Sequence, residues 1–136
     1  MIEITDKEID LNRVIRCVQD PSAGGIDIFI GTTRNHSGGK TVLAMEYQAY
    51  IPMALKIMNE LAELVRSKWD IRQIAIVHRI GRVEVGEPSV VIAVSAGHRK
   101  EAFEACRFMI DNLKESAPIW KKEVFREGEA WVTRFV

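Results

Sequence analysis

The chain has 136 residues, of which 47% are hydrophobic and 28% are charged, as expected of a folded domain with a core of its own. Nineteen basic residues balance nineteen acidic ones, which excludes a general electrostatic attraction to nucleic acid or membranes. No apolar run approaches the roughly 20 residues that span a bilayer, and the N-terminus lacks a signal-peptide pattern. We therefore expect one cytoplasmic domain over residues 1–136.

The first half of the chain predicts short strands and amphipathic helices. Asp10 is a suitable N-cap for a helix that carries Leu11, Val14 and Val18 on one side. Residues 26–30 have the character of a strand buried on at least one face. The expected elements are a strand over Ile2–Thr5, the helix after Asp10, strands over residues 26–30 and 42–47 joined by a long polar loop over residues 31–40, and a helix over residues 52–69.

The second half predicts two further strands, a long helix and a closing pair of strands. Strands and helices alternate only loosely, and several strands are hairpin-like neighbours. The sequence therefore predicts an α+β domain in which mixed or antiparallel sheets pack against two long helices. The expected elements are strands over residues 73–79 and 89–96, a helix over residues 102–113, and short strands over residues 119–125 and 130–135 with Gly128 in the turn between them.

Two motifs that could suggest chemistry have simpler structural explanations. Cys17 and Cys106 lack the spacing of a metal-binding pair, and both lie in apolar contexts typical of small core residues. Residues 38–41 read Gly-Gly-Lys-Thr, like the end of a phosphate-binding loop. However, Arg34 occupies the place of the first required glycine, and the residues that follow favour a strand over a helix. We expect neither a metal site nor a nucleotide site of this type.

Basic side chains follow two of the predicted strands. Arg34 lies just past the strand over residues 26–30, where side chains often point into a ligand cleft, and its guanidinium can bind a phosphate through two hydrogen bonds. His36, in the same loop, is equally well explained as a solvated loop residue. For His78, at the end of another strand, a hydrogen-bonded structural role is the simpler interpretation.

Three basic residues, His98, Arg99 and Lys100, stand at the start of the long helix whose apolar residues lie in the range 102–113. The first turn of a helix favours acidic residues, because its unpaired N–H groups and the helix dipole make it electropositive. Conflicts between sequence and local preference are expected at functional sites. An anionic ligand at this helix start would resolve the conflict.

Lys114 closes the same helix, and Lys121 follows just past Pro118. Proline prevents one continuous helix through both lysines, so the chain turns and the two ammonium groups could face one cleft. Such a lysine pair can act as acid, base or nucleophile, although two ordinary surface lysines remain the alternative. Trp120 is suited either to stacking on a flat heterocycle or to the core.

The length of this helix separates the two groups of cations. Arg99 and Lys114 are fifteen residues apart, which corresponds to about 22 Å along a helix axis. One small ligand cannot reach both within a single chain. Either there are two sites, or one site combines the His98 region of one subunit with the Lys114 region of another, as a two-fold homodimer would allow.

Four fragments in order along the chain carry a family resemblance. They are Arg-Asn-His at residues 34–36, His-Arg-Ile-Gly at 78–81, Ala-Gly-His-Arg at 96–99, and the segment 114–123, which contains Ala-Pro-Ile-Trp-Lys-Lys-Glu. Each fragment is weak alone, but the ordered set is specific. Over residues 2–131 the chain resembles the catalytic (large) subunit family of molybdopterin synthase.

The resemblance implies an α/β-hammerhead-type fold and a homodimer that binds a small ubiquitin-like partner at each end, forming a heterotetramer. The partner's C-terminal Gly-Gly thiocarboxylate would enter a pocket of this chain. Sulfur would pass there to cyclic pyranopterin monophosphate (precursor Z), and two transfers would form the dithiolene of molybdopterin. The resemblance implies no metal and no organic cofactor for this subunit.

The same resemblance implies roles for particular residues. Lys114 and Lys121 match the catalytic lysines, while residues 37–40 lie in a loop that varies in the family and inherit no role. Ile119 stands where relatives can carry an aromatic residue, so the pocket wall differs there. The residues implied in substrate binding are Thr32, Thr33, Arg34, His98, Arg99, Lys114, Lys121, Lys122 and Glu123.

Two other classes of function remain open from the sequence. A non-catalytic domain that binds a phosphorylated metabolite would use the same cations for their charge alone. Binding of single-stranded nucleic acid is the weakest alternative, because the net charge is zero and no regular stripe of basic and aromatic residues is present.

Overall fold

The computed structural model of the protein describes residues 1–126 and 128–131. One of its two sheets has four strands, in the order β1-β5-β7-β2, and we call it the larger sheet because its strands contain more residues than the five strands of the other. The β1–β5 pair is parallel, whereas β5–β7 and β7–β2 are antiparallel. β5 and β7 are central and almost wholly buried, which explains their runs of β-branched residues. The strands are β1 (Ile2–Thr5), β5 (Ile71–Arg79), β7 (Pro88–Ala96) and β2 (Gly25–Thr32).

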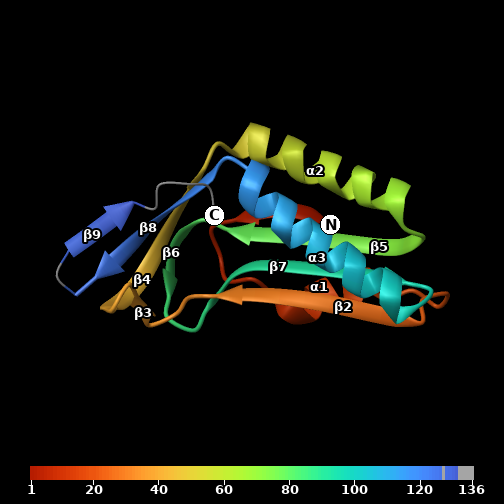
Figure 1. Ribbon diagram of the computed structural model, residues 1–136, viewed down its shortest axis with the longest axis horizontal. Helices are drawn as coiled ribbons and strands as arrows, with labels where there is room; N and C mark the ends of the chain where they lie inside the picture. Colours follow the sequence, from red (N-terminus) through yellow and green to blue (C-terminus); the bar gives the residue numbers. More distant parts are fainter. Residues whose placement is uncertain (127, 132–136) are drawn as a thin grey trace.

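Helices cover both faces of this sheet (Figure 1). α2 (Ile51–Lys68) and α3 (Arg99–Ser116) pack on one face, where Ile74 and Ile76 of β5 join the main core. α1 (Leu11–Val18) packs on the other face against Ala75 and Val77. The alternation of strand side chains thus divides β5 between two cores.

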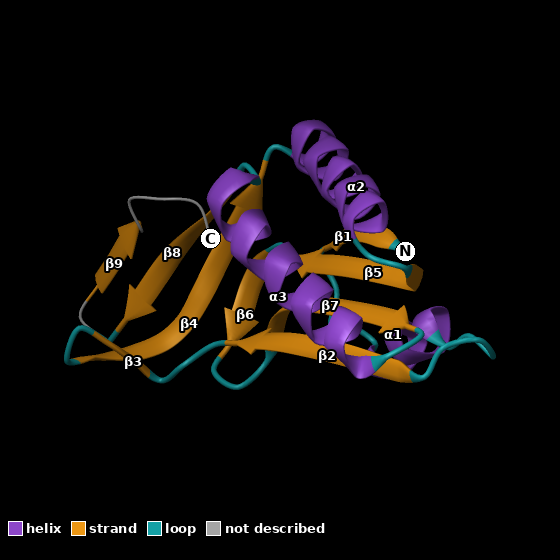
Figure 2. Cartoon of the chain, turned by 45° about the vertical axis from the view of Figure 1, so that its right-hand side comes forward, coloured by secondary structure: helices purple, strands orange, loops and turns teal. Residues whose placement is uncertain are grey.

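A smaller sheet lies beside the larger one and contains the C-terminal strands (Figure 2). Its order is β3-β4-β8-β9, with β6 paired to β4. β5 continues through Ile80 into β6, so the two sheets meet where β5 ends. The strands are β3 (His36–Ser37), β4 (Lys40–Ala49), β6 (Gly81–Glu84), β8 (Ile119–Phe125) and β9 (Gly128–Trp131).

The α+β class and the two long helices predicted from the sequence are confirmed. Asp10 caps α1 as expected, accepting a hydrogen bond from the backbone N–H of Arg13 at 3.1 Å. α3 runs from Arg99 to Ser116, so it extends beyond the apolar range 102–113 at both ends and begins at the basic residues that were expected to open it. Of the last predicted strand, residues 130 and 131 belong to β9, and residues 132–135 lie outside the described part of the chain; β9 begins at Gly128, which was expected in the turn before the strand.

Three sequence predictions are wrong in detail. The loop expected over residues 31–40 is largely a hairpin, in which β3 pairs with β4 around Gly38 and Gly39, both at positive φ. β6 was not expected, because its four residues show no clear alternation. The strand over residues 26–30 is less buried than expected: Ile28 packs against the core under α1, but Ile26, Phe29 and Ile30 are exposed. β2 is an edge strand, which among the described strands pairs with β7 alone.

The interpretation of Cys106 as a core residue is confirmed. Its side chain is buried against β7, and burial, reinforced by the negative charge of Asp27, raises the pKa of its thiol to about 12. Cys17 is only half-buried. Among the described residues, no helix is long and apolar enough to cross a membrane.

Candidate active site

The two groups of cations lie at opposite ends of one continuous helix. α3 runs without interruption from Arg99 to Ser116, so Arg99 and Lys114 are about 22 Å apart along its axis. We call the surroundings of Lys114, Lys121, Tyr47 and His78 the lysine end, and those of His98 and Arg99 the histidine end. The separation predicted from the sequence is therefore present in the structure.

The turn at Pro118 brings the chain back from α3 into the smaller sheet. Ala117 and Ile119 are buried on either side of the proline, and the Pro118 carbonyl accepts a hydrogen bond from the backbone N–H of Tyr50 at 3.1 Å. β8 then pairs antiparallel with β4, which sets Lys121 directly opposite Tyr47. Directly paired residues point to the same face of a sheet, so these two side chains are neighbours.

Tyr47 connects Lys121 with the larger sheet. Its buried ring meets the ring of His78 edge-on, with centroids 5.1 Å apart. His78 in turn lines a small cavity of about 10 Å³ that Lys114 also lines. Both lysines therefore border the junction of the two sheets. The other residues that line the cavity are Val90, Ile110, Leu113 and Ile119.

Polar atoms that are buried without a hydrogen-bond partner concentrate at this junction. Six such atoms occur in the described part of the chain, and five of them belong to Thr33, His78, Arg79 and Glu123. The Arg79 guanidinium faces Glu87 at 3.5 Å, an ion pair without hydrogen-bond geometry. Buried polar groups are nearly always hydrogen-bonded in a completed structure. Their concentration at one place is typical of a site that a ligand or a second chain completes.

Burial controls the ionisation of two side chains at the junction. The pKa of His78 is lowered to about 4, chiefly by burial and to a lesser degree by the charge of Lys114, while the hydrogen bond to the Arg79 carbonyl acts in the opposite direction. His78 is therefore neutral near pH 7. Burial also raises the pKa of Tyr47, against a hydrogen bond from Ser89 and together with the charge of Glu123. The junction thus combines neutral hydrogen-bonding groups with cationic lysines.

The segment after β2 contributes a buried threonine and an exposed arginine. Thr33 is held by backbone hydrogen bonds to the β6–β7 turn, from its N–H to the Glu87 carbonyl at 3.3 Å and from the Gly86 N–H to its own carbonyl at 2.9 Å. Its hydroxyl is one of the buried atoms without a partner. Thr32 and Arg34, on either side, are exposed.

Lys122 and Glu123 lie on opposite faces of β8. Glu123 shares the face of Lys121, and its buried Oε2 has no partner among the described residues. Lys122 points the other way, where its ammonium lies 2.9 Å from Glu46 and 3.1 Å from Glu129. The structure thus brings Glu123 to the junction but places Lys122 in an ion-pair network on the far face.

The side chains of the histidine end are exposed, but the backbone beneath them is tightly packed. His98, Arg99 and Lys100 are all exposed, and His98 makes no side-chain cap to α3. The loop before β2 packs tightly beneath them, because Gly24 donates its N–H to the Ala96 carbonyl at 2.9 Å and leaves no room for a Cβ against the Gly97 carbonyl. Basic side chains that project from a rigid base, at an electropositive helix start, suit an anionic ligand.

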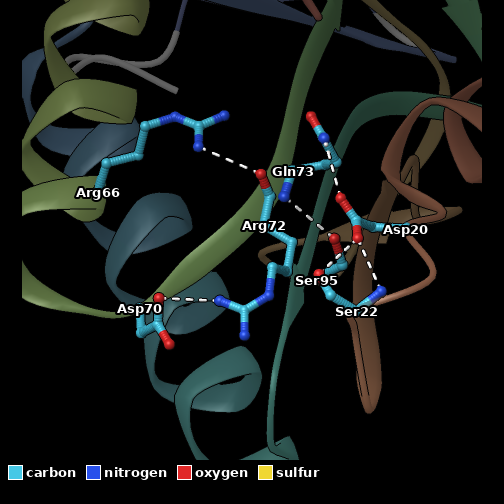
Figure 3. Close-up of polar contacts among 7 residues, drawn as sticks. All are labelled: Asp20, Ser22, Arg66, Asp70, Arg72, Gln73 and Ser95. Carbon is cyan, nitrogen blue, oxygen red and sulfur yellow. Dashed lines mark hydrogen bonds and ion pairs between the residues drawn. The ribbon is translucent and has the colours of Figure 1, made fainter.

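A polar network anchors this loop to the larger sheet (Figure 3). The Asp20 carboxylate accepts hydrogen bonds from Ser22 at 2.9 Å and from the Gln73 side chain at 3.2 Å, and the Gln73 N–H donates to Ser95 Oγ at 3.1 Å. These bonds, those from Ser22 first, lower the pKa of Asp20. The network fixes the loop that supports the histidine end.

Sequence reasoning missed Tyr47, Arg79 and Ser89 as members of the junction. Arg79 could have been found, because it follows His78 at a strand end. Tyr47 and Ser89 become visible only through strand pairing. Trp120 is 38% exposed, so the core role considered for it is wrong. In residues 1–126 and 128–131, no group of three or more His, Cys, Asp or Glu residues is arranged to hold a metal ion.

In this α+β domain, two lysines border a buried polar junction, and further basic residues lie at the other end of the same helix. This arrangement is typical of an enzyme subunit that acts on anionic reactants. The similarity of the chain to known proteins points to the same class. The model of the MoaE protein family matches residues 4–116. The chain belongs to this family, the catalytic subunits of molybdopterin synthase, and the resemblance inferred from its motifs is confirmed.

Individual relatives cover nearly the whole chain. A molybdopterin synthase catalytic subunit of Arabidopsis thaliana is 50% identical over 133 residues, covering 96% of this chain and 67% of the relative. A second, from Aedes aegypti, is 49% identical over 129 residues, with 94% and 83% coverage. The crystal structure of molybdopterin synthase from Staphylococcus aureus superposes with a TM-score of 0.93 at 34% identity, covering 97% of this chain and 96% of that one.

Proposed function

We propose that this chain catalyses the transfer of sulfur from the C-terminal thiocarboxylate of a small ubiquitin-like partner ending in Gly-Gly to cyclic pyranopterin monophosphate (precursor Z). Each transfer would return the partner as a carboxylate whose new oxygen comes from water. Two transfers would supply the two sulfurs of the molybdopterin dithiolene. The observation that carries the proposal is the junction itself, where Lys114 and Lys121 border five buried polar atoms that find no hydrogen-bond partner among the described residues.

The charges of the reactants suit this site. A thiocarboxylate and a cyclic phosphate are both anions, and charge develops further as sulfur adds and the phosphate ring opens. Ammonium groups held at a partly buried junction stabilise such charge more strongly than they would in water. We propose that Lys114 acts at the reacting carbon or at the thiocarboxylate, as a proton donor or a transient nucleophile. Lys121 would assist Lys114 and hold the substrate.

The remaining residues would bind the substrate. Thr33 and Glu123 would use their unpartnered buried oxygens, and Thr32 and Arg34 would close the same side of the junction. Lys122 is implied in binding by the family motif; its ion pairs with Glu46 and Glu129 give it the further role of holding β8 in place.

We further propose that the site is completed across a homodimer. His98 and Arg99 of one subunit would hold the phosphate of a substrate whose reacting carbons lie at Lys114 of the other, because about 22 Å separates these residues within one chain. One small partner on each subunit would make a heterotetramer. We place this single-domain subunit in the cytoplasm, where its two free cysteines would remain reduced.

The test combines the protein with thiocarboxylated partner and precursor Z and measures molybdopterin formed. The unsubstituted chain should form the dithiolene, while Lys114→Ala should lower the rate by about a hundredfold or more. Lys114→Arg should lose nearly as much, because arginine keeps the charge but does not release a proton near neutral pH. Full activity in Lys114→Ala would refute the catalytic assignment, and full activity in Lys114→Arg would reduce the role of Lys114 to its charge.

A further inference from the structure

His78 has one satisfied and one unsatisfied ring nitrogen. Nδ1 lies 2.7 Å from the carbonyl oxygen of Arg79. A carbonyl can only accept, so the ring hydrogen of the neutral imidazole is on Nδ1, and Nε2 carries a lone pair. Nε2 is buried and has no hydrogen-bond partner among the described residues. The contact between Nδ1 and the Arg79 carbonyl explains how the ring is held, but it leaves Nε2 as an acceptor without a donor.

The cavity that His78 lines offers a single candidate for that donor. The other lining side chains are Lys114 and four aliphatic residues, and aliphatic side chains cannot donate a hydrogen bond. The charge of Lys114 already acts on His78, so the two groups are close. Lys114 itself is exposed in the last turn of α3, and no hydrogen bond or ion pair with another described residue fixes its ammonium group.

We propose that His78 is a positioning residue for Lys114: its Nε2 accepts a hydrogen bond from the Lys114 ammonium and holds that group at the junction of the two sheets. The Arg79 carbonyl and the edge-on contact with Tyr47 fix the plane of the imidazole, so the lone pair has a defined direction. The inference rests on the proposed function, because it assumes that Lys114 acts in sulfur transfer.

A purely structural histidine would be satisfied by the contact with the Arg79 carbonyl alone. The two roles depend on different ring nitrogens, and two amide substitutions separate them. In His78→Asn the side-chain amide can reach the position of Nδ1 and donate to the Arg79 carbonyl, but no acceptor remains at Nε2. In His78→Gln an amide oxygen can reach the position of Nε2, but the contact with the carbonyl is lost.

The experiment measures steady-state sulfur transfer by both variants in the complex with thiocarboxylated partner. His78→Asn should lower kcat by about tenfold to a hundredfold, the range for a lost hydrogen bond to a charged group, with little change in KM for precursor Z. His78→Gln should recover most of that loss. Activity retained in His78→Asn, or a larger loss in His78→Gln than in His78→Asn, would overturn the proposal.

A second measurement keeps His78 in place and therefore does not depend on the folding of either His78 variant. The nitrogen resonances of the His78 ring in the unsubstituted complex should identify the Nδ1–H form, and Lys114→Met should shift the Nε2 resonance. Lys56→Met removes the same charge from an exposed position on α2 and should leave that resonance in place. An Nε2 resonance that does not respond to Lys114→Met would also overturn the proposal.

Failure of this inference is distinguishable from failure of the proposed function. If Lys114→Ala is inactive while His78→Asn is fully active, Lys114 keeps its role and His78 has no part in positioning it. If Lys114→Ala is active, the proposed function of Lys114 fails, whatever the His78 variants do. When both assignments hold, adding His78→Asn to Lys114→Ala should cause no further loss, because the two residues act as one unit.

Discussion

The two ends of α3 use cationic side chains in opposite ways. At the lysine end, Lys114 and Lys121 border buried polar atoms that have no hydrogen-bond partner in the described part of the chain, and two sheets converge around them. At the histidine end, His98 and Arg99 stand exposed on a base that is packed and hydrogen-bonded. The first end has the enclosure that chemistry requires, while the second has the charge that binding requires.

We infer from this difference that neither end of α3 is a complete site by itself. The lysine end has enclosure and nucleophilic groups, and the segment after β2 adds the exposed guanidinium of Arg34. The histidine end has cations but, apart from one buried oxygen of Glu101, none of the unpartnered buried atoms of the described residues. A second copy of the chain, related by two-fold symmetry, would combine one end from each subunit.

The largest expected effect tests this combination directly. Lys114→Ala and Arg99→Ala should each be nearly inactive alone. In a mixed dimer, the Arg99→Ala subunit supplies an intact Lys114 and the Lys114→Ala subunit supplies an intact Arg99, so one of the two sites is fully native. An equal mixture, dissociated and reassociated, should therefore recover about a quarter of the native activity, since half of the dimers are mixed.

The control for this experiment pairs Lys114→Ala with Lys121→Ala. Both substitutions lie at the lysine end, so one site of the mixed dimer loses Lys114 and the other loses Lys121. No recovery is expected from that mixture. Equal recovery in the two mixtures, or none in either, would show that the ends of α3 do not cooperate across a dimer.

A smaller effect should follow from disturbing the base of the histidine end alone. Gly24→Ala introduces a Cβ that collides with the Gly97 carbonyl, at a cost of about 1–3 kcal/mol in the free energy of unfolding. Since His98 and Arg99 follow Gly97, we expect KM for precursor Z to rise several-fold while kcat changes little. Urea unfolding and steady-state kinetics measure the two effects.

Gly38→Ala is the matched control for that prediction. Gly38 has φ of +56° and open space around it, so alanine there causes backbone strain in the β3–β4 hairpin without touching the base of the histidine end. It should lower stability and leave KM unchanged. A KM that rises equally in both variants would mean that the effect of Gly24→Ala comes from general destabilisation.

Local patterns were sufficient for the features that lie within one element. The spacing of apolar residues predicted α3 and, through its length, the separation of Arg99 from Lys114, and Pro118 predicted the turn between Lys114 and Lys121. These properties depend on residues that are close in sequence. They required no knowledge of how the sheets pair.

The features that were missed depend on pairing between distant strands. Tyr47 belongs to the junction because β4 pairs with β8 in one register, and a shift by a single residue would have turned it to the other face. The same alternation directs Lys122 away from Lys121. β2 was expected to be buried because it is hydrophobic, but nothing in its own residues indicates that it lies at the edge of the sheet.

The pH dependence of stability offers the smallest effect and distinguishes the buried end from the open one. The pKa of His78 falls from 6.5 to about 4 on folding, so below pH 6.5 the unfolded chain binds a proton that the folded chain does not. Stability from this source is complete above pH 6.5 and is lost as the pH falls toward 4. Between pH 7 and pH 5 the loss should be about 2 kcal/mol.

Urea unfolding at these two pH values measures that loss, and His78→Asn should remove it, making the variant less sensitive to acid than the native chain. His36→Asn is the control, because His36 is exposed in β3 and its replacement should leave the slope unchanged. A native slope in His78→Asn would mean that the imidazole can become charged within the fold. The junction would then be open to water like the histidine end, and the contrast between the two ends of α3 would disappear.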